Sequence, residues 1–210
     1  GSPSFPARLR SFTSSLTPWR MANGSFRNGT IEVDPGLDLR GYGTMEAMTV
    51  NGLVTITDNS LVVRRDINLT GAIQFVNSAN LNSQGTNTVN GGTLSFENGS
   101  ITVDSQLTLS PTTQVSMRGG YVNGNGLLIN KGAFRSVQKN APHYFYISRL
   151  QNEGLLEASQ EASINIQNSA WTSTGILRAT GANSLIQLGG TFGSVIPVTE
   201  RVSGGSIHLT

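Results

Sequence analysis

The stretch Gly52-Leu-Val-Thr-Ile56 has a five-residue pattern that returns through most of the chain. It is followed by Gly71-Ala-Ile-Gln-Phe75 and Gly92-Thr-Leu-Ser-Phe96, and similar pentads begin at Gly29, Thr113, Gly132, Gly154 and Gly175. The pentads start about 21 residues apart, with little variation in spacing. A degenerate sequence with so steady a period predicts a solenoid, in which each repeat forms one coil.

Each pentad alternates hydrophobic and polar residues. In the pentad that begins at Gly52, Val54 and Ile56 are hydrophobic and Thr55 between them is polar. Such alternation predicts a short strand with one buried face. The opening glycine follows an asparagine in Asn28-Gly29 and Asn51-Gly52, which predicts a turn with positive φ.

Further alternating pairs lie between the pentads, so each repeat is expected to hold two or three short strands. These pairs are Leu37/Leu39, Leu61/Val63, Ile67/Leu69, Ile101/Val103, Leu107/Leu109 and Ile164/Ile166. One repeat cannot bury its own apolar face, whereas stacked repeats bury one continuous column. We therefore predict an all-β fold, a parallel β-helix (β-solenoid) with coils of about 21 residues. Eight coils stacked at about 4.8 Å would form a rod about 40 Å long.

Two regions depart from the repeat. Residues 1–27 contain no pentad, and we interpret them as an N-terminal cap or flexible arm, since solenoid ends need covering. Residues 28–210 are assigned to the solenoid, which an aromatic insertion at 137–150 interrupts.

The insertion contains His143, Tyr144, Phe145 and Tyr146, which are the best candidates for a binding site. Exposed aromatic side chains can stack on sugar rings or anchor a partner protein. The alternative is a local strand whose Tyr144 and Tyr146 face one side and cover the hydrophobic column.

Charge and composition exclude several classes of protein. Charged residues make up only 12% of the chain, the net charge is +2, and there is no cysteine. A disulfide scaffold, a cysteine-ligated zinc site and a thiol nucleophile are therefore excluded. No uninterrupted apolar stretch has the length of a membrane helix, so we expect no membrane insertion. No basic stripe with interleaved aromatic residues is present, so we expect no nucleic-acid partner.

The fourth residues of three successive pentads carry alternating charge. They are Arg135, Glu157 and Arg178. If the pentads superimpose, these side chains form an exposed structural charge ladder on neighbouring coils. Each exposed pair contributes under about 1 kcal/mol, so the ladder is more informative about register than about stability.

No catalytic, metal or cofactor site is predicted. Glu153, Glu157 and Glu161 are the densest acidic group, but Glu157 belongs to the charge ladder, and catalysis on a β-helix needs carboxylates gathered over adjacent coils. His143 and His208 lack the spaced partners of a zinc site, and His208 is expected on the surface. The regular Thr-x-Thr ladder of ice-binding solenoids is also missing.

Three stretches resemble coils of a known group of proteins. They are Ile129-Asn-Lys-Gly-Ala-Phe-Arg-Ser136, Asn152-Glu-Gly-Leu-Leu-Glu-Ala-Ser159 and Ser173-Thr-Gly-Ile-Leu-Arg-Ala-Thr180. They are similar to the repeats of bacterial surface β-helix proteins, the filamentous-haemagglutinin-like adhesins and autotransporter passengers. The similarity covers about residues 28–188 and implies a right-handed β-helix that is secreted or exposed at the cell surface and acts in adhesion without a cofactor. The Asn-Pro-Asn motifs of that family's secretion domain do not occur.

We therefore expect a non-catalytic, secreted or cell-surface β-helix segment that acts as an adhesin stalk or binding surface. Its expected partners are glycans or proteins of a host or cell surface, and the ends of the solenoid are open to self-association. The alternative is a carbohydrate-binding or carbohydrate-cleaving β-helix similar to phage tailspikes or pectin lyases.

Overall fold

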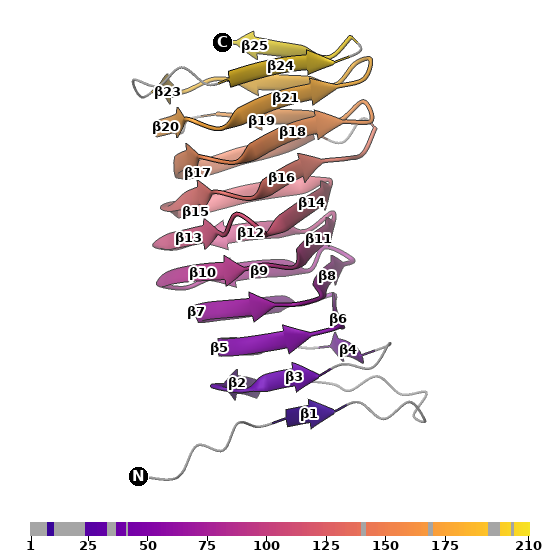
Figure 1. The fold of residues 1–210 in the computed structure, drawn as a ribbon, viewed down its shortest axis with the longest axis vertical. Coiled ribbons are helices and arrows are strands. Elements are labelled where there is room, and N and C mark those ends of the chain that lie inside the picture. The colour runs from indigo at the N-terminus through magenta and orange to yellow at the C-terminus, as the bar shows by residue number, and fades with distance from the viewer. Residues whose placement is uncertain are drawn as a thin grey trace.

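A computed structural model describes residues 8–10, 24–32, 37–40, 42–139, 142–167, 170–192, 198–202 and 204–210. The described residues form two sheets, and all strand pairs within them are parallel. The coils, about eight in number, stack along the long axis of the molecule (Figure 1). The predicted all-β solenoid with coils of about 21 residues is thereby confirmed. No helix long and apolar enough to cross a membrane occurs among these residues.

The smaller sheet has nine strands, one from each successive coil. In chain order they are β4 (Leu37–Arg40), β6 (Leu53–Thr57), β8 (Ala72–Val76), β11 (Thr93–Glu97), β14 (Gln114–Arg118), β16 (Ala133–Ser136), β18 (Leu155–Ser159), β21 (Ile176–Thr180) and β24 (Val198–Val202). Seven of the eight pentads form consecutive strands of this sheet, from β6 to β21.

The larger sheet has sixteen strands, because most coils contribute two segments to it. The strands are β1 (Arg8–Arg10), β2 (Gly24–Arg27), β3 (Thr30–Glu32), β5 (Gly43–Asn51), β7 (Ser60–Leu69), β9 (Asn80–Ser83), β10 (Thr86–Asn90), β12 (Ser100–Val103), β13 (Gln106–Leu109), β15 (Gly120–Asn130), β17 (Pro142–Asn152), β19 (Ser163–Ile166), β20 (Ala170–Ser173), β22 (Leu185–Leu188), β23 (Thr191–Phe192) and β25 (Ser206–Leu209). In β5, β7, β15 and β17 both segments belong to one long strand. The β5–β7 and β15–β17 ladders each shift register between the two segments.

The first pentad differs from its prediction. Residues 30–32 form β3, which pairs with the end of β5 in the larger sheet. The first place in the smaller sheet belongs to β4, which contains the alternating pair Leu37/Leu39, and the last belongs to β24, which does not have the pentad pattern. Alternation alone identifies a strand with one buried face, but it does not tell which of two sheets that strand joins.

The core is one column of stacked hydrophobic side chains. The third residues of the pentads from Val54 to Leu177 are all buried. Phe75 and Phe96 stack in the column with their ring centroids 4.5 Å apart. Stacking of like on like in successive coils keeps the column filled along the rod.

The pentad glycines are required mainly by close approach between coils. Gly52 has the predicted positive φ of 95°, but Gly132, Gly154 and Gly175 do not belong to the positive-φ residues. A Cβ added at Gly154 would collide with the carbonyl oxygen of Gly132, and one at Gly175 would collide with that of Gly154. The turn predicted from sequence is present, but for most pentads the physical reason for glycine is the stacking of backbone on backbone.

A buried polar ladder supports the turns that lead into the smaller sheet. Asn130 donates from Nδ2 to Oδ1 of Asn152 over 2.8 Å, and Asn152 donates to Oγ of Ser173 over 3.0 Å. All three side chains are at most 1% exposed. Their mutual hydrogen bonds satisfy amide groups that would be costly to bury alone, although Oδ1 of Asn130 accepts no hydrogen bond.

The two regions that depart from the repeat join the sheet nonetheless. Within residues 1–27, β1 pairs with β3 and β2 pairs with β5, while the rest of the predicted cap or arm lies outside the described residues. Residues 142–150 of the predicted insertion belong to β17, which pairs with β15 below, across the shift in register, and with β19 and β20 above. The aromatic stretch therefore interrupts the sequence pattern but not the stack of strands.

Candidate binding surface

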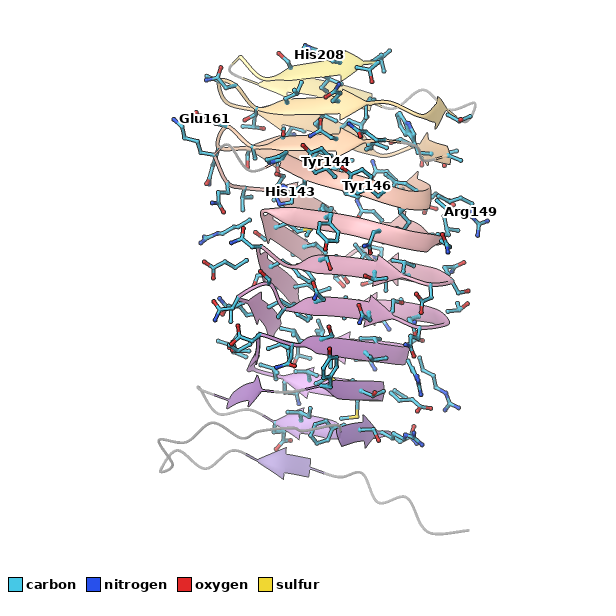
Figure 2. All side chains as sticks on the ribbon, turned by 180° about the vertical axis from the view of Figure 1, so that it is seen from behind. His143, Tyr144, Tyr146, Arg149, Glu161 and His208 are labelled. Carbon is cyan, nitrogen blue, oxygen red and sulfur yellow. The ribbon has the colours of Figure 1, made fainter. Side chains whose placement is uncertain are left out.

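The four aromatic and histidine residues of β17 point alternately inward and outward. His143 is 1% exposed and Phe145 is fully buried, whereas Tyr144 is half-buried and Tyr146 is 48% exposed. Figure 2 shows where His143, Tyr144 and Tyr146 lie on β17. Only the two tyrosines of the predicted binding cluster can therefore contact a ligand from solvent.

The two tyrosines stack on each other at the outer surface. Their ring centroids are 5.4 Å apart and their planes differ by 8°. On the neighbouring strand β15, Tyr121 is the register partner of Tyr144 and is 46% exposed. The sequence does not single out Tyr121, because the glycines around it obscure the alternation of a strand. The spacing of about one coil between Tyr121 and Tyr144 was the signal that could have revealed it.

The three tyrosines lie on a face that carries no formal charge. Two rows of outward positions follow from the register of the first segments of the larger sheet. One row is Ser60, Asn80, Ser100, Tyr121, Tyr144, Asn165, Gln187 and His208, and the other is Thr44, Val62, Asn82, Thr102, Asn123 and Tyr146. Neither row, as far as the described strands extend, includes Asp, Glu, Lys or Arg. We call these two rows the uncharged face.

The acidic group considered as catalytic is instead used to join coils. Lys131 contacts Glu153 at 3.3 Å, Arg135 contacts Glu157 at 3.0 Å, and Lys139 contacts Glu161 at 2.9 Å. Each base lies on one coil and its acid on the next. In the part of the chain that the structure describes, no three His, Cys, Asp or Glu side chains are close enough to hold a metal ion.

The charge ladder has the register that the repeat predicts. Arg135 is the strand partner of Glu157, and Glu157 is the partner of Arg178. The Glu157 side chain is only 12% exposed, so the ladder is more enclosed than expected. Thr180 Oγ1 also donates to Glu157 Oε1 over 3.0 Å, which explains part of this enclosure.

His143 serves the interior of the fold. Its Nδ1 is hydrogen-bonded to Ser136 Oγ. Burial lowers the pKa of His143 from 6.5 to about 4, against the opposing effect of backbone hydrogen bonds with Gly119 and Ser163, so the ring is neutral near pH 7. Ser136 is fully buried, and this pair of hydroxyl and imidazole is therefore closed to a substrate. His208 is exposed, as predicted.

Shallow hollows lie at some distance from the three outward tyrosines, among the residues that the structure describes. One of about 180 Å³ lies on the smaller sheet, where the outward residues Ser95 and Ser116 are small beside Gln74 and Arg118. Another of about 250 Å³ lies beside Tyr42 and Thr44 at the lower end of the rod. Both are smaller than typical ligand pockets.

Comparison of the chain with protein-family models, with curated proteins and with solved structures finds no match.

Proposed function

We propose that this chain is a non-catalytic, secreted or cell-surface β-solenoid that acts as an adhesin-like stalk and binding surface. The observation that carries the proposal is the set of ion pairs from Lys131, Arg135 and Lys139 to the glutamates of the next coil. These glutamates help to hold adjacent coils together, and the lysine and arginine side chains balance their negative charge.

The shape of the molecule suits this role. Every coil contacts mainly the coils below and above it, so the fold can extend in one dimension while its flanks stay open to solvent. An extended flank offers a partner many equivalent positions. This is the arrangement expected of a stalk that presents a surface.

Carbohydrate binding is a compatible second function, and the observation that favours it is the group of three outward tyrosines on the uncharged face. Cleavage of a carbohydrate is less well supported. A glycosidase or lyase needs a carboxyl group poised beside the scissile bond, whereas Glu153, Glu157 and Glu161 each contact a cationic side chain.

The location can be tested by treating intact cells of the source organism with a protease and identifying the released peptides by mass spectrometry. We expect peptides of this chain in the released fraction, together with those of known surface proteins. Recovery of the chain only after lysis, alongside cytosolic markers, would overturn the proposal.

The absence of catalysis can be tested separately. The purified chain is incubated with neutral and anionic polysaccharides, and their length is followed by size-exclusion chromatography. We expect no shortening, and shortening that persists through repurification of the protein would overturn the non-catalytic assignment.

A further inference from the structure

We propose that Tyr121, Tyr144 and Tyr146 form a binding site for an uncharged glycan. The inference rests on the proposed function, because it names the ligand class of the proposed binding surface. We call these three residues the tyrosine patch.

The rings of the tyrosine patch are exposed at the surface of the rod. Tyr121 and Tyr146 are 46% and 48% exposed, although their strands β15 and β17 lie within the stack and are paired on both sides. Tyr144 joins them, as the register partner of Tyr121 and the stacking partner of Tyr146. Three clustered aromatic side chains at the surface make an apolar area with phenolic hydroxyl groups, which suits the apolar faces and hydroxyl groups of a sugar ring.

The rings of Tyr144 and Tyr146 are held in place by their neighbours. Tyr144 and Tyr146 stack on each other, with ring planes that differ by 8°. Between them, Phe145 points into the core and packs on Phe134, with the two ring centroids 5.2 Å apart. A rigid platform loses little conformational entropy when a ligand binds. The patch is therefore positioned before any ligand arrives.

Hydrogen-bonding side chains lie around the rings of the tyrosine patch. Asn123 is the register partner of Tyr146, and Asn165 is the partner of Tyr144 on the opposite side. The Oδ1 atom of Asn123 is enclosed and accepts no hydrogen bond, which carries a desolvation cost. Side-chain amides recognise hydroxyl groups because they both donate and accept.

The lack of charged side chains in the two rows distinguishes neutral glycans from anionic ones as ligands. The two rows of the uncharged face contain no Lys or Arg that could pair with a sulfate or carboxylate group, and the first exposed cation after Tyr146 on β17 is Arg149, which lies outside both rows. Charge-assisted hydrogen bonds from Arg and Lys are the usual means of holding such groups. We therefore assign a neutral glycan to the tyrosine patch, in preference to an anionic one.

The test measures retardation of the purified chain in native gels that contain one polysaccharide each. The neutral probes are dextran, laminarin, galactomannan, xyloglucan and soluble starch, and the anionic probes are polygalacturonate and heparin. We expect retardation by at least one neutral probe, unaffected by added salt. The Tyr144→Ala/Tyr146→Ala variant should bind that probe about tenfold or more weakly, because aromatic anchors carry much of the affinity at such sites.

The control is Tyr42→Ala, which removes a tyrosine that is 61% exposed and lies several coils below the patch. It should bind as the parent chain does, and all variants should show the same circular dichroism and melting temperature. Equal binding by the double variant, binding to the anionic probes alone, or no retardation by any neutral probe would overturn the glycan site. So would binding to host-cell glycoproteins that survives their deglycosylation, because it indicates a protein partner. None of these results affects surface exposure of the chain, which the protease experiment tests separately.

Discussion

His143 links the stability of the fold to pH through one buried imidazole. Its pKa is lowered from 6.5 to about 4 in the folded chain, so the unfolded chain binds more protons between these two values. Stability therefore rises with pH across this window, is complete above about pH 6.5, and falls as pH approaches 4. Between pH 6.5 and 4 the free energy of unfolding falls by about 3 kcal/mol, because each unit of pKa shift corresponds to about 1.4 kcal/mol. Urea unfolding at a series of pH values measures it.

The two histidines of the chain provide a matched comparison. A His143→Asn variant should be less stable at neutral pH and should lose most of the slope between pH 4 and 6.5. His208→Asn should keep the parent slope, because His208 is exposed. If both variants titrated alike, the slope would have to originate in other groups.

Gly154 tests whether the stacked turns tolerate a side chain. A Cβ at this position would meet the carbonyl oxygen of Gly132 on the coil below, and overpacking of this kind costs about 2 kcal/mol or more. We expect Gly154→Ala to lower the free energy of unfolding by that amount in urea titrations.

Gly85→Ala is the suitable control for this change. Gly85 has a φ of +82° and open space where its Cβ would lie, so only backbone strain of about 1 kcal/mol is expected there. A larger loss at Gly85 than at Gly154 would show that conformation, and not contact between coils, determines the need for glycine.

At the level of strands, the charge ladder can be inverted. Glu157→Arg would place three cations in register, from Arg135 through position 157 to Arg178. Like charges directly opposite each other on neighbouring strands are destabilising, and we expect a loss of about 1 to 2 kcal/mol that shrinks in high salt. Thermal unfolding at low and high salt measures the effect.

The same reversal at Glu161 serves as the comparison, since its partner Lys139 is 64% exposed and the pair is well hydrated. The cost there should be smaller, and a combined Arg135→Glu/Glu157→Arg exchange should recover part of the loss at 157. If both charge reversals lowered stability equally, the lower exposure of Glu157 would have no effect on the strength of its ion pair.

Strands and their register were largely predictable, because alternation of polar and hydrophobic residues survives in each repeat. The pairing of Arg135, Glu157 and Arg178 followed from the period alone. The sheet that β3 and β4 join was not predictable, since the residues of both strands alternate in the same way. β24 was not predictable as a strand, because three polar residues follow one another in Val198-Thr-Glu-Arg-Val202. The exposure of the tyrosine patch also depended on knowing that β17 continues the ladder of β15, which decides the side that Phe145 faces.

For the molecule as a whole, we expect stability to be graded along the rod. Strands such as β14 are hydrogen-bonded to a coil on either side, whereas β25 pairs with β22 alone among the described strands. Local opening therefore costs more in the middle than at the ends. Hydrogen exchange followed by mass spectrometry should show slower exchange in β8 to β18 than in β25, and uniform exchange would indicate all-or-none opening.

Because charge alternates along the ladder, the number of coils between two of its residues decides whether their charges attract or repel. If recombination removed the single coil that bears Glu157, Arg135 would come to lie beside Arg178, and two like charges would meet at the junction. Removal of two neighbouring coils would restore opposite signs. At this junction the ladder therefore opposes the loss of one coil more than the loss of two, even though the hydrophobic column would accept either.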